Sequence, residues 1–161
     1  MIIAIDPGTK RSAYCCLLNG KVSCYGTEEN LKVLRMIRGP MSDWYAGSDT
    51  LAIEQIASMG MSVGQEIFDT VQWVGRFQEA WENRGGTCLM VRRIAVKMHL
   101  CGNVRAKDAN IRTACIDQFG GKEAAIGKKK YPGPLFGIKA DEWSALAIGL
   151  TAAAKLEENT K

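Results

Sequence analysis

The sequence has little of what thiolate-metal and nucleotide-binding sites require. It contains one histidine, His99, and no Cys-x-x-Cys pair, which excludes the common zinc-ligand patterns. The segment GMSVG at residues 60–64 is not followed by Gly-Lys-Ser or Gly-Lys-Thr, which excludes a P-loop. His99 could serve as a proton shuttle, but its apolar neighbours favour a packing role at the start of a helix.

Long hydrophobic runs free of charge are also missing. Asp6 interrupts the apolar N-terminal segment, so we expect no signal peptide. The apolar segment from Trp143 onwards reaches membrane-spanning length only if charged residues are included, so we expect no transmembrane helix. The six cysteines lie mostly inside apolar segments, and the neighbours Cys15 and Cys16 would point to opposite faces of a strand. These patterns predict buried free thiols in a reducing compartment, and hence a cytoplasmic protein.

The charge is modestly positive but unevenly distributed. The chain of 161 residues has a formal net charge of +4 and a pI near 8.8. Between residues 97 and 139, basic side chains far outnumber the acidic ones. The basic residues are Lys97, Arg105, Lys107, Arg112, Lys122, Lys128, Lys129, Lys130 and Lys139. Such a segment favours contact with a polyanion such as nucleic acid, although the run at 128–130 alone would be typical of a solvated loop.

Hydrophobic periodicity and turn residues predict alternating strands and helices. Strands are expected at residues 1–5, 12–18, 21–25, 50–54 and 87–91, and helices at 28–38, 62–83, 106–119 and 141–156. Asn19-Gly20 predicts a hairpin turn, and residues 120–137, rich in Gly, Pro and Lys, are expected to form a mobile loop. With no internal repeat or linker, this order predicts one α/β domain over residues 1–161, a five-stranded mixed sheet flanked by helices.

Three acidic residues lie at the ends of apolar segments. Asp6 follows MIIAI, Glu54 follows TLAI, and Asp141 precedes WSALAIGL. Each alone would more often be structural: Asp6 as a turn former, Glu54 as an exposed strand end and Asp141 as a helix N-cap. Because strand ends and helix starts can aim side chains at one point, we expect the three to converge. Converging carboxylates repel one another unless a cation lies between them, and their hard oxygens suit Mg²⁺ or Mn²⁺.

Longer strings carry a family resemblance. IDPGT, AIEQ, KMHLCGNVRAKDANIRTACIDQF and KADEWSALAIGL follow one another over almost the whole chain. In this the chain resembles the RuvC-type Holliday-junction resolvases, and its compact length fits a bacterial or phage member. The resemblance implies an RNase H-like fold and a homodimer that cuts four-way DNA junctions by paired symmetric nicks. It also implies two divalent metal ions, Mg²⁺ or Mn²⁺, and a cytoplasmic location in a bacterial or phage-infected cell.

The resemblance assigns roles to particular residues. Asp6 and Glu54 match the metal-binding acids that end the first and fourth strands, and Asp141 matches the first acid of the final helix. Lys97 matches a basic residue of a motif that contacts DNA, and Lys107 lies within one position of another. From their place in the basic segment, and near the expected site, we add as candidate phosphate contacts Arg105, Lys128, Lys129, Lys130 and Lys139.

Two positions depart from the family pattern. Ser144 stands where the family usually has a fourth metal-binding Asp or His, and serine is a weak neutral ligand. Glu142 is the nearest acid that could replace it, although a neighbour at i+1 of Asp141 points about 100° away on a helix. Ala57 stands where the family often places an aromatic residue that stacks at the junction centre. Candidates to replace that aromatic are Met59, Met61 and Phe68.

The helix expected at residues 62–83 carries more apolar surface than one sheet face needs. Its apolar stripe comprises Val63, Ile67, Val71, Val74, Phe77 and Trp81. The aromatic residues Phe68, Trp73 and Phe77 cannot all face inward on one narrow stripe. Since two symmetric nicks require two sites related by a twofold axis, we expect this helix to form the homodimer interface, with Trp73 facing outward.

Other functions compete with junction cleavage. A related RNase H-like nuclease could act on other branched DNA or on RNA. The turn Asp6-Pro7-Gly8-Thr9 also resembles the phosphate-binding turn of sugar kinases and actin-like ATPases, but these need a second lobe, for which 161 residues leave little room. A catalytically inactive DNA-binding module is disfavoured because the three acids are retained.

Overall fold

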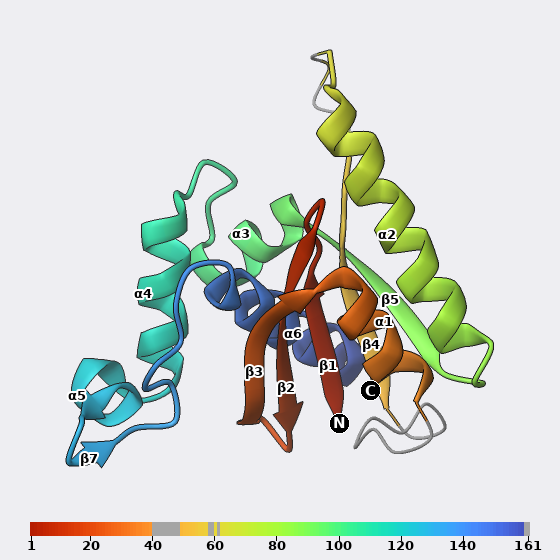
Figure 1. The fold of residues 1–161 in the computed structure, drawn as a ribbon. Coiled ribbons are helices and arrows are strands. Elements are labelled where there is room, and N and C mark those ends of the chain that lie inside the picture. The colour runs from red at the N-terminus through yellow and green to blue at the C-terminus, as the bar shows by residue number, and fades with distance from the viewer. Residues whose placement is uncertain (40–48, 58–59, 61, 160–161) are drawn as a thin grey trace.

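The computed structural model describes residues 1–39, 49–57, 60 and 62–159 (Figure 1). Its strands are β1 (Ile2–Asp6), β2 (Arg11–Leu18), β3 (Lys21–Glu29), β4 (Thr50–Gln55), β5 (Thr87–Arg92), β6 (Gly127–Lys128) and β7 (Tyr131–Pro132). Its helices are α1 (Asn30–Arg38), α2 (Gln65–Glu82), α3 (Arg93–Cys101), α4 (Asp108–Gln118), α5 (Gly121–Ala125) and α6 (Glu142–Glu158).

The main sheet has five strands in the order β3-β2-β1-β4-β5. β1 pairs with β2, and β2 with β3, in antiparallel fashion, whereas β1 pairs with β4, and β4 with β5, in parallel. Asn19 and Gly20 both have positive φ between β2 and β3, as a tight hairpin turn requires. The predicted five-stranded mixed sheet flanked by helices is therefore confirmed.

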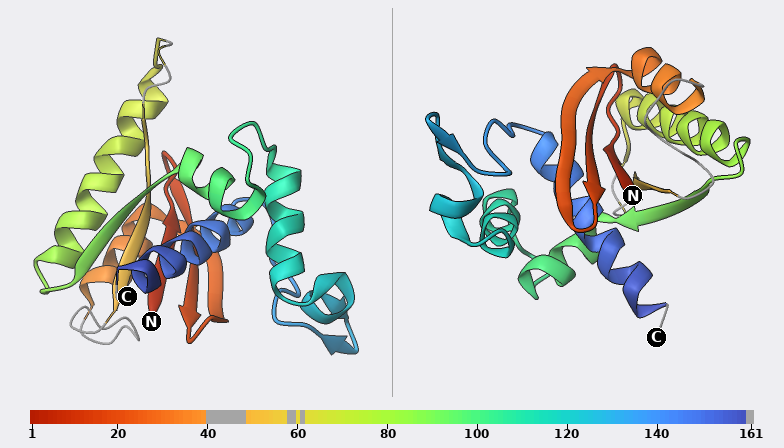
Figure 2. Two further views of the ribbon diagram at one scale, coloured as in Figure 1. Left: turned by 180° about the vertical axis from the view of Figure 1, so that it is seen from behind. Right: turned by 90° about the horizontal axis from the view of Figure 1, so that it is seen from below.

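Alternation along the strands divides the core into two layers. Ile3 and Ile5 of β1 face α1 and α2, whereas Ala4 between them faces α6. Figure 2 shows the two layers, with α1 and α2 on one side of the sheet and α6 on the other. Gly149 of α6 lies so near β1 that an added Cβ would be 3.2 Å from the Cβ of Ala4, so small residues let α6 lie close to the sheet.

Two segments differ from the sequence prediction. Residues 93–101 form α3, which was not predicted, and His99 lies exposed in its last turn rather than at a helix start. The loop expected at 120–137 is instead built from α5, β6 and β7. It is anchored by Leu135, which is 1% exposed and whose N–H donates to the Ala125 carbonyl at 2.7 Å. Short elements held by one buried side chain leave no periodic pattern to read.

The thiols follow the prediction in part, since Cys88 and Cys101 are only partly buried and Cys24 is exposed. All six cysteines are free, and Cys15, Cys16 and Cys115 are buried. Cys24 is exposed, because it lies on the edge strand β3, where one face is open to solvent. Across the residues for which the structure gives a placement, no helix is long and apolar enough to cross a membrane.

Candidate active site

Asp6 and Glu54 lie side by side at the carboxyl ends of two neighbouring inner strands, β1 and β4. The parallel register pairs Ile5 of β1 with Ile53 of β4, so the next residues, Asp6 and Glu54, lie at the same end of the sheet. Glu54 is 9% exposed, and the Asp6 and Glu54 carboxyl groups lie close enough for hydrogen bonding between them to raise the pKa of Asp6. The structure thus brings together the first two acids that the sequence singled out.

The environment of Asp6 disfavours its charged form. Burial raises the pKa of Asp6 to about 8, with further contributions from the charge of Glu54, the hydrogen bond to Glu54 and the charge of Asp141. Arg93 acts in the opposite direction but does not offset these effects. Without a bound cation Asp6 therefore keeps its proton at neutral pH, and a cation at this end of the sheet would favour its charged form.

This shift predicts a pH-dependent effect of Asp6→Asn on stability without metal. The folded protein keeps the Asp6 proton after the unfolded chain has lost it, so this residue costs stability as pH rises from 3.8 to about 8. One pKa unit corresponds to about 1.36 kcal/mol. Allowing for relaxation of the site, the free energy of unfolding of Asp6→Asn should rise relative to that of wild type by about 1–3 kcal/mol between pH 5 and pH 9. Urea unfolding in EDTA at both pH values measures this. A difference between the two proteins that does not change with pH would contradict it.

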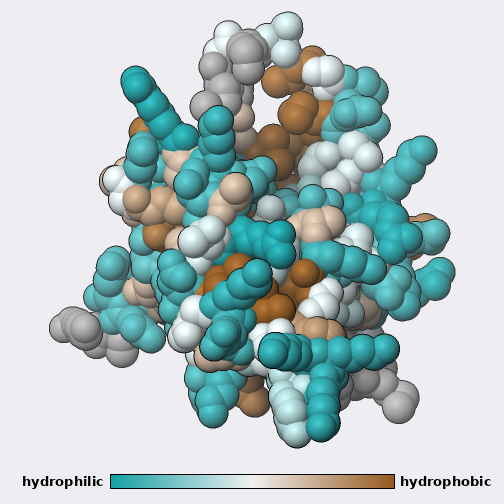
Figure 3. Space-filling model, turned by 90° about the vertical axis from the view of Figure 1, so that its left-hand side faces the viewer, coloured by the Kyte–Doolittle hydropathy of each residue, from teal (hydrophilic) through white to brown (hydrophobic). Residues whose placement is uncertain are grey.

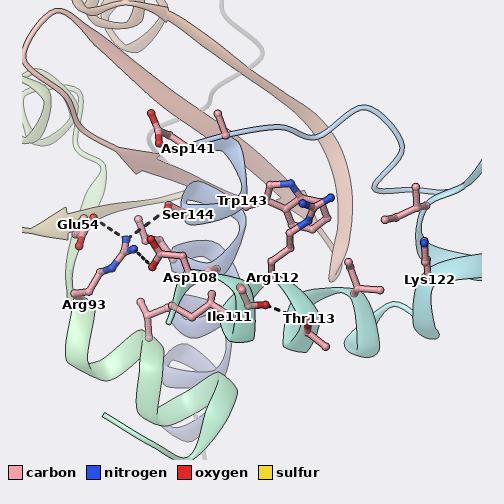
Figure 4. Close-up of a pocket in the computed structure, with 17 residues that line it drawn as sticks. Glu54, Arg93, Asp108, Ile111, Arg112, Thr113, Lys122, Asp141, Trp143 and Ser144 are labelled. Atoms are coloured by element: carbon pink, nitrogen blue, oxygen red, sulfur yellow. Dashed lines mark hydrogen bonds and ion pairs between the residues drawn. The ribbon is translucent and has the colours of Figure 1, made fainter. Parts of the chain in front are cut away.

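Arg93 is a member of the site that the sequence analysis missed. It is the first residue of α3, directly after β5, and Figure 4 shows its guanidinium facing three side chains from three elements. Nη1 lies 3.8 Å from Glu54 Oε2 and donates to Ser144 Oγ at 3.5 Å, and Nη2 lies 2.5 Å from Asp108 Oδ1. Burial lowers the pKa of Arg93, but the charges of Glu54 and Asp108 outweigh this effect and raise it, so Arg93 stays charged.

The start of α6 places two acids in different surroundings. Asp141 is the N-cap residue, but its side chain makes no capping hydrogen bond, and it lies exposed and apart from Glu54 in Figure 4. Glu142 is 3% exposed, and its carboxylate accepts from the Thr27 hydroxyl at 3.3 Å and from the Lys139 N–H at 3.0 Å. These bonds tie Glu142 to β3 and to its own turn, not to Asp6.

The acids fit one hard cation better than a complete metal centre. Within the part of the chain that the structure describes, no group of three or more Asp, Glu, His or Cys side chains is placed to hold a metal ion. Asp6 and Glu54 nevertheless offer adjacent, largely buried carboxylate oxygens. That donor chemistry suits Mg²⁺ or Mn²⁺, and the charge of Asp141 also acts on Asp6.

A groove of about 680 Å³ leads away from these acids between α4 and α6. Arg112 of α4 lies over the Trp143 ring, 4.9 Å from its centroid, and both line the groove (Figure 4). Figure 3 shows this side of the molecule, where hydrophilic side chains surround smaller hydrophobic areas. Other lining residues are Glu54, Arg93, Asp108, Lys122, Asp141 and Ser144. The groove thus joins the acid cluster to basic side chains that a phosphate backbone could follow.

The predicted DNA-contacting residues fall into two groups. Lys97 lies half-buried on α3, with Arg105 and Lys107 exposed on the connection to α4. The run 128–130 is exposed in the β6–β7 hairpin, at the far end of α4 and α5 from the ends of β1 and β4 (Figure 1). Lys139 is exposed just before α6. A ligand that touched both groups would have to extend across this side of the molecule.

Of the residues suggested in place of Ala57, Phe68 lies within the described part of the chain. Ala57 itself is exposed after β4. Met59 and Met61 lie outside the described residues. Phe68 is 53% exposed near the start of α2, with Ile67 and Val71 of the same helix and Val63 just before it also exposed.

Comparisons with known proteins identify the fold. No protein-family model and no curated protein sequence matches the chain. A structure of Thermus thermophilus RuvC matches at 15% identity with a TM-score of 0.67, covering 99% of this chain and 96% of that one. A structure of T. thermophilus RuvC in complex with Holliday junction substrate matches at 17% identity, with the same TM-score and coverage. The chain therefore has the RuvC-type, RNase H-like fold that the sequence resemblance implied.

Proposed function

We propose that this protein is a metal-dependent endonuclease that cuts four-way DNA junctions. The observation that carries the proposal is the adjacent pair Asp6 and Glu54, which lie together at the carboxyl ends of two neighbouring parallel strands. The matching fold supports it, since one of the similar structures is described as a complex with Holliday junction substrate. The basic residues along the groove supply the complementary charge for a DNA backbone.

The metal would be held by carboxylates of this chain. Asp6 and Glu54 would be its first two ligands, and Asp141 the third. When bound, a divalent cation lowers the pKa of a water and stabilises charge on the phosphate. Ser144 offers only a neutral hydroxyl for the second ion that the resemblance implies, and that hydroxyl faces Arg93.

The remaining residues would orient the strand. Arg112, held against Trp143, and Lys122 would contact phosphates in the groove. Lys97, Arg105, Lys107 and Lys139 would contact flanking phosphates near the acids, and the hairpin run 128–130 would contact a more distant arm. These contacts position DNA without reading its sequence.

The hairpin lysines give a direct test of this footprint. Replacing Lys128, Lys129 and Lys130 together by Ala should weaken junction binding about tenfold at moderate salt. The salt slope should fall by about one unit for each phosphate that these lysines no longer neutralise. A matched control removes three lysines from other regions, namely Lys21, Lys32 and Lys155. Binding titrations at several salt concentrations measure both slopes. Equal slopes for the two triple variants would show that the hairpin run is only solvated charge.

Cleavage of defined substrates tests the function itself. The protein is incubated with Mg²⁺ and end-labelled four-way junction, fork, linear duplex and RNA–DNA hybrid of the same sequence. Symmetric paired cuts in the junction, with little cutting of duplex, are expected. Preference for the fork or the hybrid would favour the alternative, an RNase H-like nuclease for other branched DNA or for RNA. Absence of any cutting with Mg²⁺ and with Mn²⁺ would contradict both.

The kinase-like alternative gains no support from the Asp6-Pro7-Gly8-Thr9 turn. The Gly8 N–H donates to Ser12 Oγ at 3.3 Å, and the Gly8 carbonyl accepts from Asn30 Nδ2 at 2.8 Å. A phosphate-binding turn needs free N–H groups directed at its ligand. Here the Gly8 amide is directed into the protein's own hydrogen bonds.

A further inference from the structure

The Arg93 side chain contacts residues of three different elements at the acid cluster. Its guanidinium lies 3.8 Å from Glu54 Oε2 on β4, 3.5 Å from Ser144 Oγ on α6 and 2.5 Å from Asp108 Oδ1 on α4 (Figure 4). The Arg93 side chain is 37% exposed and that of Glu54 is 12% exposed, so the pair is partly shielded from solvent. Arginine keeps its charge at any pH at which the protein is folded.

The placement of Arg93 explains why residue 144 is neutral. An acid at position 144 would lie where the Arg93 guanidinium already donates to Ser144 Oγ. It would form an ion pair with Arg93 and have little capacity left for a metal. Two divalent ions in a nuclease site lie about 4 Å apart and share carboxylates. Arg93 Nη1 lies 3.8 Å from Glu54 Oε2, so its fixed charge repels a second divalent ion beside Glu54.

We propose that Arg93 takes the place of the second divalent cation, so that this site binds one metal ion, held by Asp6, Glu54 and Asp141. The inference deepens the proposed nuclease function and rests on it. In the reaction, the guanidinium would donate hydrogen bonds to the phosphate being cut and stabilise its charge. It would perform there the electrostatic part of what a second ion does in two-metal nucleases.

Counting bound Mn²⁺ tests the proposal without relying on cleavage. Titration calorimetry gives the number of ions per chain, and electron paramagnetic resonance distinguishes an isolated Mn²⁺ from a magnetically coupled pair. Wild type should bind one isolated ion. Ser144→Asp alone should still bind one, because Arg93 would pair with the new carboxylate. The double variant Arg93→Gln with Ser144→Asp should bind two ions and show the coupled signal.

Controls separate charge in general from charge at position 93. Arg92→Gln removes the neighbouring positive charge, whose Nε donates to Gln55 Oε1 of β4 at 3.2 Å. The double variant Arg92→Gln with Ser144→Asp should still bind one ion. In the junction complex, where DNA also binds Mn²⁺, the coupled signal alone is read, and wild type should lack it. Circular dichroism verifies the fold of each variant.

The outcomes distinguish this proposal from the proposed function. A coupled pair of ions in wild type, free or on a junction, would overturn the assignment to Arg93 and leave a metal-dependent nuclease intact. A folded double variant that still binds a single ion would also overturn it. No bound ion in wild type would remove the metal-dependent function and this inference together.

Discussion

Asp6→Asn, Glu54→Gln and Asp141→Asn should each reduce junction cleavage at saturating Mg²⁺ by about a thousandfold or more, while junction affinity stays within about threefold. Each change removes a negative charge from the proposed metal site and leaves the basic groove unchanged. A thousandfold loss corresponds to about 4 kcal/mol of transition-state stabilisation. Single-turnover cleavage and gel-shift binding of the same junction measure the two effects separately.

Glu142→Gln is the matched control for this series. It removes an acid next to Asp141, but that carboxylate bonds to Thr27 and to the Lys139 N–H, and glutamine keeps an acceptor for one of them. Cleavage by Glu142→Gln should stay within about tenfold of wild type, since no reacting group is changed. Substantial cleavage by Asp6→Asn, or a loss in Glu142→Gln as large as that in Asp141→Asn, would refute the assigned roles.

The acids could be found from the sequence because strand ends leave a clear pattern. An apolar run that stops at a charged residue marks the edge of a sheet, and both Asp6 and Glu54 follow such runs. Parallel pairing of β1 and β4 then aligns them without further information. What the sequence did not show is that Asp141 lies exposed and apart from Glu54.

Arg93 was missed because the helix that begins with it, α3, was not predicted. In α3 only Val96 is buried, and Ile94 and Met98 are 53% and 48% exposed, so its apolar residues form no inward stripe. Arg93 nevertheless directly follows β5, which pairs in parallel with β4, the strand that carries Glu54. A basic residue that follows a parallel strand at the same end of the sheet as the acids is a signal that could have placed Arg93 in the site.

Position on α2 was predicted less well than the helix itself. The outward aromatic was expected to be Trp73, and this is wrong, because Trp73 is half-buried. The centroids of the Trp73 and Phe77 rings lie 5.7 Å apart, and the Arg76 guanidinium lies 4.1 Å from the centroid of the Trp73 ring. Phe77 is fully buried, and Phe68 is the aromatic that faces outward, at 53% exposed. Periodicity identifies the apolar side of a helix, but which part the sheet covers depends on where the helix crosses it.

The crossing of α2 leaves an apolar patch at its N-terminal half. Val74, Phe77 and Trp81 in the C-terminal half are buried against the sheet. The α2 patch consists of Ile67, Phe68 and Val71 of α2, which are 38%, 53% and 46% exposed, and of Val63 just before the helix, which is 40% exposed. Figure 1 shows why: α2 extends beyond the sheet at its start, so no layer of the described chain covers it. Contiguous exposed apolar side chains of this kind mark interaction sites in soluble proteins.

Phe68→Glu should therefore dissociate a homodimer, so that the two nicks are no longer made within one binding event. A twofold axis through the α2 patch would bring two copies of it together and place two identical sites on opposing strands of a junction. A buried aromatic at such an interface contributes about 2 kcal/mol or more, so the dimer dissociation constant should rise at least about thirtyfold. Sedimentation at micromolar concentration should give about twice the 17.6 kDa chain mass for wild type and one chain mass for Phe68→Glu.

Leu31→Glu is the control that makes this result specific. Leu31 is 51% exposed on α1, so it introduces the same charge at an equally exposed apolar residue outside the α2 patch. It should stay dimeric and cut both strands of a supercoiled cruciform within one binding event, giving linear product. Phe68→Glu should give mainly nicked circles, because each protomer leaves before its second cut. A wild-type protein that stays monomeric on junction DNA and still makes paired nicks would show that resolution here needs no twofold interface.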